Sequence, residues 1–353
     1  MSGAPLSSRA RRTTGFPDPA PSLHAPGAGL GILVNANAKR GGRRVAAQLA
    51  RVLPGAAVRL TRRVEEIDEW LATLPDMRGI LAAGGDGTAV GLLTVLDRRR
   101  RLGLPSVPVG ALPLGTGNAW AHALGARKLA SCVRWLAAHD GPLPTRKYTL
   151  LRCENTVTFF AGSGWDAQIL NDYREQLRDS KGPIRNVNKT AYGYVTAMLS
   201  RTVPKALIGG RPRVLVECLG DVAYGLDERG VPCRLEGPAR GRILYDGPAS
   251  SAGAATCPEF GFRFRAYPFA ERYPGLMNVR VYDQKPLRAV AHIGRLWGGV
   301  FPLEGMHDFF CDHVRMTFSR PVPLQIGGEA VGMRTTAEFQ VVPEIDVIDW
   351  RGL

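Results

Sequence analysis

Apolar runs alternate with amphipathic segments through the first part of the chain. Residues 30–34, 79–83 and 107–112 are short apolar runs, and residues 45–52 and 64–74 between them repeat apolar positions at helical spacing. Short apolar runs that alternate with helical patterns are typical of buried strands in a parallel sheet that helices cover on both faces. The pattern therefore predicts an α/β fold for this part of the chain.

The pattern changes beyond residue 145, where short segments alternate apolar and polar positions and are rich in β-branched residues. This alternation predicts strands, and many short strands together predict a β-sandwich. Helical patterns interrupt the strands at 166–178 and 187–199, and a third candidate helix covers 285–296. The predicted strands lie at 150–153, 156–160, 214–218, 261–267, 276–282, 314–318 and 337–342.

The length of 353 residues predicts two domains, because one domain usually takes about 100 to 200 residues. We expect an N-terminal α/β nucleotide-binding domain at 29–145 and a β-rich substrate domain at 146–345. The prediction leaves open that the C-terminal end packs back on the first domain. Residues 1–28 are rich in Arg, Ser, Pro and Gly and predict a disordered tail, with a transit peptide as the alternative.

The net charge of +15 lies mostly near the N-terminus, where residues 1–63 hold eleven Lys or Arg and one acid. Such a block attracts polyanions, but it has no interleaved aromatic residues to stack bases, so we expect no nucleic-acid partner. No stretch approaches the roughly 18 apolar residues that span a bilayer. Six cysteines lie singly, as reduced thiols in a cytoplasm do. These features predict a cytoplasmic protein, and they leave a homo-oligomer open.

Two glycine-rich loops follow consecutive apolar runs and are the best candidates for chemistry. The first is Gly84-Gly85-Asp86-Gly87-Thr88, and the second is Gly115-Thr116-Gly117-Asn118. Strands of a parallel sheet end on the same edge, so both loops should meet there at helix N-termini. Glycines permit positive φ and close approach of backbone N–H groups to an anion, and Thr88 can cap its helix. The pair predicts a polyphosphate site.

Neither loop matches the common nucleotide motifs. No Gly-Lys-Ser/Thr follows, which excludes a Walker A loop, and the spacing excludes a dinucleotide fingerprint. Asp86 would hold a magnesium ion beside a polyphosphate or order the loop.

The order, spacing and content of these loops resemble the catalytic domain of the diacylglycerol and sphingosine type lipid kinases, relatives of the NAD kinases. The resemblance extends from Gly84–Thr88 through 113–125, and it includes an upstream loop at 35–41 and the segment 162–167. It covers roughly residues 29–345. It implies a nucleotide domain followed by a β-sandwich domain with the site between them, and transfer of the γ-phosphoryl of ATP to a lipid hydroxyl.

The resemblance also implies which residues bind ATP and Mg²⁺. Asp86 would serve the magnesium ion or the acceptor hydroxyl. The expected contacts with ATP are Asn35, Lys39, Arg40, Gly84, Gly85, Gly87, Thr88, Gly115, Thr116, Gly117 and Asn118.

Three acids that many members of this family carry are missing. The chain has Ala119, Pro274 and Gly327 at these positions. The family's acidic pair near the C-terminus implies a general base, and Glu329 is the surviving candidate, with a solvated turn acid as the alternative. Asp166 would orient substrate or cap the helix that begins there.

Other polar clusters have weaker patterns. His307, Asp308, Cys311, Asp312 and His313 could ligate a metal, but their spacing matches no zinc motif.

His122 follows the second glycine loop, and packing or exposure is its more common role. The aromatic side chains Trp165, Trp297, Phe309 and Phe310 could line an acyl pocket, and core packing is the default.

The sequence therefore predicts an ATP- and Mg²⁺-dependent lipid kinase that acts on diacylglycerol or a related lipid such as a sphingoid base. Its lipid substrate implies peripheral, reversible contact with a membrane surface. The missing acids leave two alternatives: an inactive nucleotide- or lipid-binding regulatory protein, and an NAD-kinase-like enzyme with a soluble acceptor.

Overall fold

The computed structural model describes residues 25–38, 41–115, 117–181, 187–188, 191–261 and 263–352. The predicted tail lies outside the described residues up to position 24. The expected ATP contacts Lys39, Arg40 and Thr116 also lie outside them.

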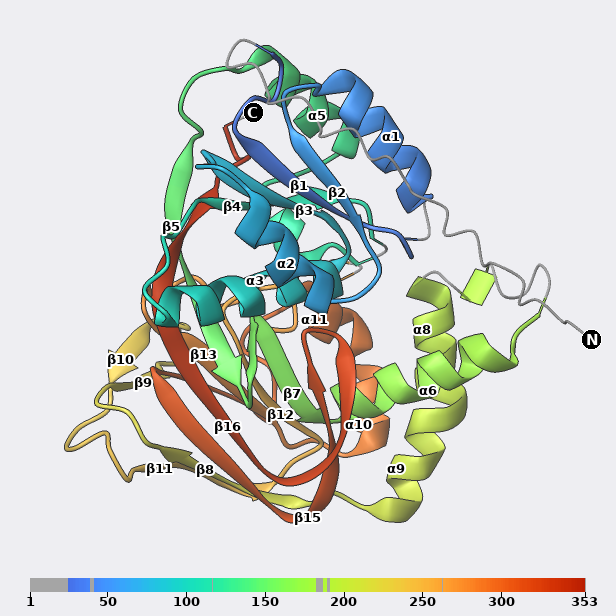
Figure 1. The fold of residues 1–353 in the computed structure, drawn as a ribbon. Coiled ribbons are helices and arrows are strands. Elements are labelled where there is room, and N and C mark those ends of the chain that lie inside the picture. The colour runs from blue at the N-terminus through green and yellow to red at the C-terminus, as the bar shows by residue number, and fades with distance from the viewer. Residues whose placement is uncertain are drawn as a thin grey trace, which may run out of the picture.

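The N-terminal region is a parallel sheet between helices, as the hydrophobic pattern predicts (Figure 1). Its strands stand in the order β2-β1-β3-β4, and β1, β3 and β4 are almost entirely buried. Helices α1 and α5 pack on one side of the sheet, and α2 and α3 pack on the other. The elements are β1 (Leu30–Asn35), α1 (Gly42–Val52), β2 (Ala57–Thr61), α2 (Glu65–Thr73), β3 (Gly79–Gly84), α3 (Asp86–Arg101), β4 (Val109–Pro113), α4 (Ala119–Ala123) and α5 (Leu129–Ala138).

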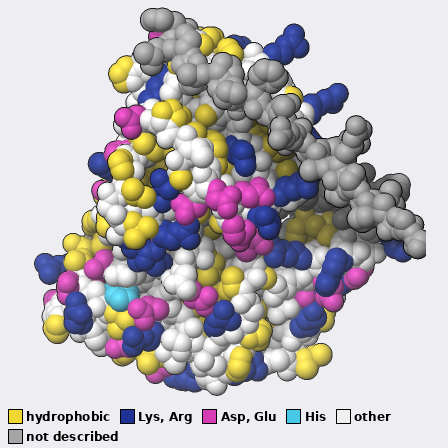
Figure 2. All heavy atoms as spheres, viewed as in Figure 1, with side chains coloured by type: hydrophobic (Ala, Val, Ile, Leu, Met, Phe, Trp, Pro, Cys, Tyr) yellow, Lys and Arg dark blue, Asp and Glu magenta, His cyan; other side chains and the backbone are white. Residues whose placement is uncertain are grey.

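Helix α2 begins with a cluster of acidic side chains. Glu65, Glu66 and Asp68 lie in its first turn, where the positive end of the helix dipole favours them. Acidic side chains gather over α2 on the face seen in Figure 2, with Lys and Arg side chains around them. The net positive charge of the chain is therefore not spread evenly over the α/β region.

The remainder of the chain is rich in antiparallel strands. The strands are β5 (Thr145–Cys153), β6 (Thr156–Thr158), β7 (Phe160–Gly164), β8 (Arg213–Cys218), β9 (Ala223–Leu226), β10 (Pro232–Arg234), β11 (Ile243–Pro248), β12 (Ser251–Ala255), β13 (Met277–Tyr282), β14 (Met306–Cys311), β15 (His313–Ile326) and β16 (Glu329–Ile348). The helices are α6 (Trp165–Asp179), α8 (Ala191–Ala197), a π-helical turn (Met198–Thr202), α9 (Val203–Gly209), α10 (Pro286–Ala291) and α11 (Ile293–Gly298).

Strand β16 connects the two regions. It pairs antiparallel with β15 and β5 along most of its length, and near its end Val347 pairs parallel with Val109 of β4. The parallel and antiparallel strands therefore form one continuous sheet, and the C-terminal end of the chain packs on the first region. The division into two domains at residue 145 stays a prediction.

Two predicted elements differ from the structure. The described residues of 261–267, which are 261 and 263–267, do not form a strand: Gly261 and Arg263 have positive φ (109° and 58°), and the Phe264 N–H donates to the Gly261 carbonyl at 2.9 Å. Alternation alone cannot reveal this turn, since its aromatic residues are spaced as in a strand. The helix predicted at 187–199 continues through the π-helical turn to Gly209.

Candidate active site

The two glycine loops lie side by side at the carboxyl edge of the parallel sheet. Strands β3 and β4 are neighbours with Gly84 paired to Pro113, and the Gly115 N–H donates to the Gly84 carbonyl at 2.9 Å. The adjacency expected from the strand order is therefore present.

The glycines are needed for close packing and not for positive φ. None of Gly84, Gly85, Gly87, Gly115 and Gly117 lies in the left-handed region, contrary to the expectation from sequence. A Cβ on Gly115 would stand 2.3 Å from the Gly85 Cα, which is far closer than real Cβ contacts. The two loops can approach each other this closely because Gly115 has no side chain, whereas a Cβ on Gly85 would make an ordinary contact of 3.4 Å with the Gly115 Cα.

The left-handed position in the second loop belongs to Asn118, with φ of 54°. Its Oδ1 accepts from the Gly115 N–H and its Nδ2 donates to the Gly115 carbonyl, both at 2.8 Å. Asparagine tolerates this conformation because its short amide can bond to nearby backbone. Asn118 therefore has a structural role in the loop.

Asn35 and Thr88 connect the end of β1 to helix α3. The Asn35 Nδ2 donates to the Thr88 Oγ1 at 3.0 Å. Thr88 does not cap its helix as predicted, because Gly85 occupies the N-cap position and no side chain caps it. The hydroxyl instead accepts a hydrogen bond from Asn35 at the end of β1 and so connects this strand end to the first glycine loop.

A pocket of about 420 Å³ lies over these residues, and we call it the Asn35 pocket. The loop that follows β1, the segment before α2 and the first glycine loop all contribute to it. Its lining includes Asn35, Asn37, Thr61, Arg62, Gly85, Gly87, Thr88 and Glu329. The predicted ATP contacts Asn35, Gly85, Gly87 and Thr88 therefore share one cavity.

A second cavity of about 420 Å³, the central cleft, lies on the other side of the same glycines. Gly85, Gly87 and Glu329 line both cavities. Residues from the two glycine loops, helix α6 and the turn between β15 and β16 surround the cleft: Gly85, Asp86, Gly87, Gly117, Asp166, Tyr173, Arg174, Gln325, Gly327, Gly328 and Glu329. The cleft thus brings together the carboxylates of Asp86, Asp166 and Glu329.

A narrow apolar cavity of about 100 Å³ adjoins the cleft. Asp166, Phe260, Phe264 and Trp297 line both spaces. The rest of its wall is mostly aliphatic and aromatic: Trp165, Ile169, Val195, Met198, Ala266, Tyr267, Tyr282, Ala289, Ile293, Leu296 and Met306. Asp166 is the only carboxylate among its lining residues, and it stands at the junction with the cleft.

Asp86 is held by the first turn of helix α4, which follows the second glycine loop. Its Oδ1 accepts the Trp120 N–H at 3.1 Å, and the Trp120 ring stacks on Phe159 with centroids 5.8 Å apart. Burial raises the pKa of the Asp86 carboxyl, while the backbone N–H groups of Ala119 and Trp120 in α4 act in the opposite direction. A Cβ on Gly117 would lie 2.9 Å from Oδ2, so this glycine leaves room for the second oxygen.

Asp166 lies in the first turn of α6, and its carboxylate also contacts side chains from other elements. The Gln325 Nε2 donates to its Oδ2 at 3.2 Å, and the Ser251 Oγ lies 3.5 Å from its Oδ1. Burial raises the pKa of Asp166 to about 7, although these hydrogen bonds favour the ionised form. A carboxyl that titrates near neutral pH can accept and release a proton under ordinary conditions.

Glu329 sits at the boundary between the Asn35 pocket and the central cleft. Arg174 of α6 donates to its Oε2 at 2.5 Å and to the Gly328 carbonyl at 2.9 Å, and the Glu329 side chain is 61% exposed. The structure therefore places Glu329 at the site and gives it a cationic partner.

The missing acid at Gly327 has a steric explanation. Gly327 has φ of 58°, and a Cβ there would lie 2.5 Å from the Val90 Cγ2. An aspartate at this position would require the turn and α3 to move apart.

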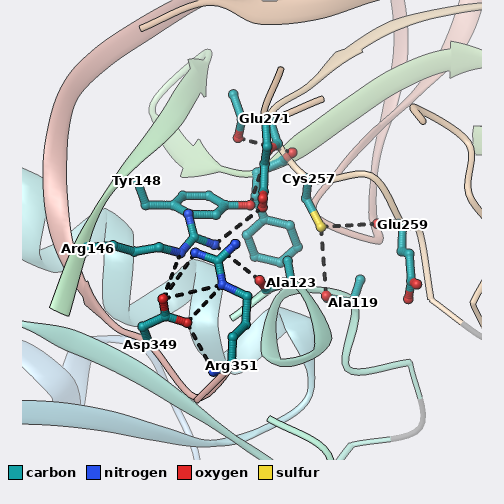
Figure 3. Close-up of polar contacts among 11 residues, drawn as sticks. Ala119, Ala123, Arg146, Tyr148, Cys257, Glu259, Glu271, Asp349 and Arg351 are labelled. Carbon is teal, nitrogen blue, oxygen red and sulfur yellow. Dashed lines mark hydrogen bonds and ion pairs between the residues drawn. The ribbon is translucent and has the colours of Figure 1, made fainter. Parts of the chain in front are cut away.

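Helix α4, which follows the second glycine loop, contacts a cluster of polar side chains (Figure 3). The Arg146 guanidinium lies 4.8 Å from the Tyr148 ring centroid, donates to the Ala123 carbonyl at 3.1 Å and approaches Glu271 at 3.5 Å. The Cys257 Sγ lies 3.7 Å from the Ala119 carbonyl oxygen. These contacts fix α4 relative to the β-rich region.

The His307–His313 cluster does not converge on one point. His307 pairs with Asp283 at 2.9 Å, Asp308 with Arg280 at 2.7 Å, and His313 with Glu338 at 2.8 Å. Within the described ranges, no group of three or more His, Cys, Asp or Glu side chains could hold a metal ion.

A magnesium site at Asp86 does not need such a group. Mg²⁺ is commonly bound by one or two carboxylates together with phosphate oxygens and water. The single carboxylate of Asp86, at the edge of the glycine loops, fits this donor set.

Sequence reasoning missed Arg174 and Gln325 and undervalued Asp166. Arg174 follows Asp166 by two helical turns, so the two point from one side of α6, and this spacing was available in the sequence. Gln325 had no pattern that could identify it. Of the four aromatic residues, Trp165 and Trp297 line the apolar cavity, whereas Phe310 is buried in the core.

His122 also lies close to this region. Its Nδ1 is 3.4 Å from Glu259 Oε2, so it is partnered within the protein.

The fold and the site define an α/β region with two glycine loops, joined to an antiparallel β-rich region, with a cleft between the glycine loops and α6. Residues 30–140 match the family profile of the diacylglycerol kinase catalytic domain. The matched residues are those of the α/β region.

Known proteins resemble the chain in two ways. The eye-specific diacylglycerol kinase of Drosophila melanogaster is 53% identical over 51 residues, which are 14% of this chain and 3% of that protein. Human diacylglycerol kinase iota is 48% identical over 56 residues, which are 16% and 5% of the two chains. These matches span only a small part of the relatives' length.

Solved structures resemble almost the whole chain. A crystal structure of a diacylglycerol kinase from Bacillus anthracis has a TM-score of 0.60 at 12% identity, and the match covers 91% of this chain and 96% of that chain. Another structure from the same organism has a TM-score of 0.62 at 14% identity, with the same coverage. At this identity the likeness establishes a shared fold.

Proposed function

We propose that the protein transfers the γ-phosphoryl group of ATP to a hydroxyl of diacylglycerol or a related lipid. The observation that carries the proposal is the apolar cavity that meets the central cleft at Asp166. An acyl chain in the cavity would place a lipid hydroxyl in the cleft, on the same side as the glycine loops.

The nucleotide would enter from the Asn35 pocket. Its triphosphate would pass the backbone of Gly85 and Gly87, which border both cavities. The N-terminus of α3 is next to this point, and its N–H groups and dipole favour negative charge. Arg174 can add a positive charge at the cleft.

Asp86 would hold a magnesium ion against the phosphates. The ion would neutralise charge on the transferred group and on the leaving diphosphate. The residues of the chain would then have three tasks: to align the nucleotide, to orient the acceptor hydroxyl and to accept its proton.

In the proposed transfer, the lipid hydroxyl oxygen forms a bond to the γ-phosphorus while the bond from that phosphorus to the β–γ bridging oxygen breaks. The hydroxyl proton passes to the carboxylate of Asp166, and ADP leaves. We assign the proton to Asp166 in preference to Glu329, because Asp166 lies where the apolar cavity meets the cleft and Glu329 is paired with Arg174.

The alternatives from the sequence are less well supported. An NAD-kinase-like enzyme has no use for an apolar cavity beside its acceptor site. An inactive regulatory protein has no need for three carboxylates around one cleft. To separate the three, ATP consumption should be measured with dispersed diacylglycerol, with a sphingoid base and with NAD. Turnover with a lipid supports the proposal, and turnover with NAD alone contradicts it.

Replacing Gly85 with valine should lower ATP affinity at least tenfold. A Cβ on Gly85 fits, in contact with the Gly115 Cα at 3.4 Å, but the two methyl groups of valine would extend from it between the glycine loops and over the phosphate path. Titration calorimetry with a non-hydrolysable ATP analogue measures the effect. Gly209→Val is the matched control, because nothing lies within 4 Å of a Cβ at that position. Unchanged ATP affinity in a folded Gly85→Val protein would mean that ATP does not bind at this loop.

Replacing Val195 with phenylalanine should shorten the apolar cavity. We expect phosphorylation of long-chain diacylglycerol to fall about tenfold or more, while a short-chain diacylglycerol and ATP binding change little. Val195 lines the cavity and is half-buried, so the larger ring enters the cavity with little strain on the core. Equal loss with both chain lengths would mean that the cavity does not bind the acyl chain.

A further inference from the structure

The helices that wall the apolar cavity also expose large apolar side chains to solvent. The continuous helical segment 191–209 contributes Val195 and Met198 to the cavity, and it exposes Leu207 (52%) and Ile208 (90%) near its end. A helix with apolar residues on both its inner and its outer side is unusual on a water-exposed surface.

Helix α10 has the same character. Ala289 lines the cavity, whereas Leu287 is 64% exposed. Helices α9 and α10 pack against each other, so Leu207, Ile208 and Leu287 lie on adjoining helices. Figure 1 shows these helices gathered beside α6 on one side of the β-rich region. We call the surface formed by α9 and α10 the α9–α10 face.

The charges near this face have one sign in the sequence. Residues 187–211 and 285–300 together hold seven Lys or Arg and no Asp or Glu. Three of the cations pair with carboxylates from elsewhere: Arg201, Lys205 and Arg288.

Two other cations near the face contact only carbonyl groups in the bonds observed. Arg211 donates to the Asp283 carbonyl and Arg295 donates to the Pro302 carbonyl at 3.1 Å, so these bonds do not cancel their charges. Exposed apolar side chains that are flanked by uncancelled cations are complementary to an anionic bilayer, because the apolar groups enter the interface and the cations meet the headgroups.

We propose that the α9–α10 face docks on an anionic lipid bilayer and so brings the walls of the apolar cavity to the membrane. The inference rests on the proposed function for its purpose, since a lipid acceptor must leave a bilayer to enter the cavity. The test of the inference is independent of the proposed function, because vesicle binding can be measured without ATP. None of the helices in the described part of the chain is long and apolar enough to cross a bilayer.

The test compares a Leu207→Ser/Ile208→Ser double variant with Leu102→Ser/Leu104→Ser. The control pair is also exposed, but it follows α3 in the α/β region. Co-sedimentation with vesicles of phosphatidylcholine and phosphatidylglycerol measures binding. We expect the first variant to bind at least tenfold more weakly, the control to bind like the wild type, and wild-type binding to weaken as salt is raised.

Activity gives a second, separate measurement. The first variant should lose phosphorylation of long-chain diacylglycerol in vesicles and keep that of a water-soluble, short-chain diacylglycerol. If the first variant loses vesicle binding but the wild type phosphorylates no lipid, the result would support membrane docking by the α9–α10 face and refute the proposed function. Undiminished vesicle binding by the first variant would overturn the proposal that the α9–α10 face docks on the bilayer. The proposal would also be overturned if the solution mass of the first variant were half that of the wild type while vesicle binding stayed the same. The face would then join two copies of the chain.

Discussion

An Asp166→Asn variant should phosphorylate lipid about two to four powers of ten more slowly than the wild type, the usual contribution of a general base. Asparagine keeps the shape of the side chain and its contact with Gln325, but it cannot take the hydroxyl proton. Initial rates with saturating ATP and diacylglycerol in mixed micelles measure the loss. ATP affinity should be unchanged, because Asp166 does not line the Asn35 pocket.

The pH profile distinguishes a base from a residue that only shapes the site. The pKa of Asp166 is raised to about 7, so the carboxyl is protonated below this pH and ionised above it. The wild-type kcat/KM should therefore rise as the pH increases through about 7 and then level off, and the rise should vanish in Asp166→Asn. Glu329→Gln is the companion variant: if it abolishes the rise while Asp166→Asn retains it, the base is Glu329.

Replacing Asp86 with asparagine should lower turnover at least a hundredfold, which is typical for loss of one preorganised electrostatic group. It should also raise the magnesium concentration needed for half-maximal rate, because the ion loses its charged ligand. Rates measured across a magnesium titration test both effects.

The Asp86 side chain also accepts the Trp120 N–H, so the second loop itself could shift in this variant. Binding of an ATP analogue without magnesium serves as the control and should stay near the wild-type value. A lower rate with an unchanged magnesium requirement would contradict the role of Asp86 as metal ligand.

The parallel sheet and the glycine loops could be predicted because local patterns determine them. Wholly apolar runs such as residues 79–83 have one common structural explanation, and the edge on which Gly85 and Gly115 meet follows from the parallel strand order. The reason for the glycines could not be predicted. The need for Gly115 arises from contact with Gly85, which is 30 residues away in sequence and becomes a neighbour only in the folded chain.

The acceptor side of the site was harder to predict from sequence. Its cavity draws on α6, α8, α10, α11 and the turn around Gly261, and of these segments only the start of α6 belongs to a motif, the segment 162–167. Phe264 was assigned to a strand predicted at 261–267, although Phe260 and Phe264 both belong to the turn that closes the cavity. The raised pKa of Asp166 likewise results from burial among distant segments, which sequence spacing does not report.

Long β16 shows another limit of local patterns. Sequence alternation identified residues 337–342, but the strand extends from Glu329 to Ile348 and joins the two regions of the chain. The register of β16 shifts between Val342 and Ile345, which interrupts the alternation of apolar and polar residues. The alternation therefore does not predict the final pairing with β4.

The most direct test of the account is the identity of the product. The wild-type protein is incubated with γ-labelled ATP, Mg²⁺ and long-chain diacylglycerol in mixed micelles, and the labelled lipids are separated by chromatography. We expect labelled phosphatidic acid that forms only when protein, ATP and diacylglycerol are all present, with far less from Asp166→Asn. A protein that binds the ATP analogue but transfers no label to diacylglycerol or to a sphingoid base, and that labels NAD instead, would contradict it.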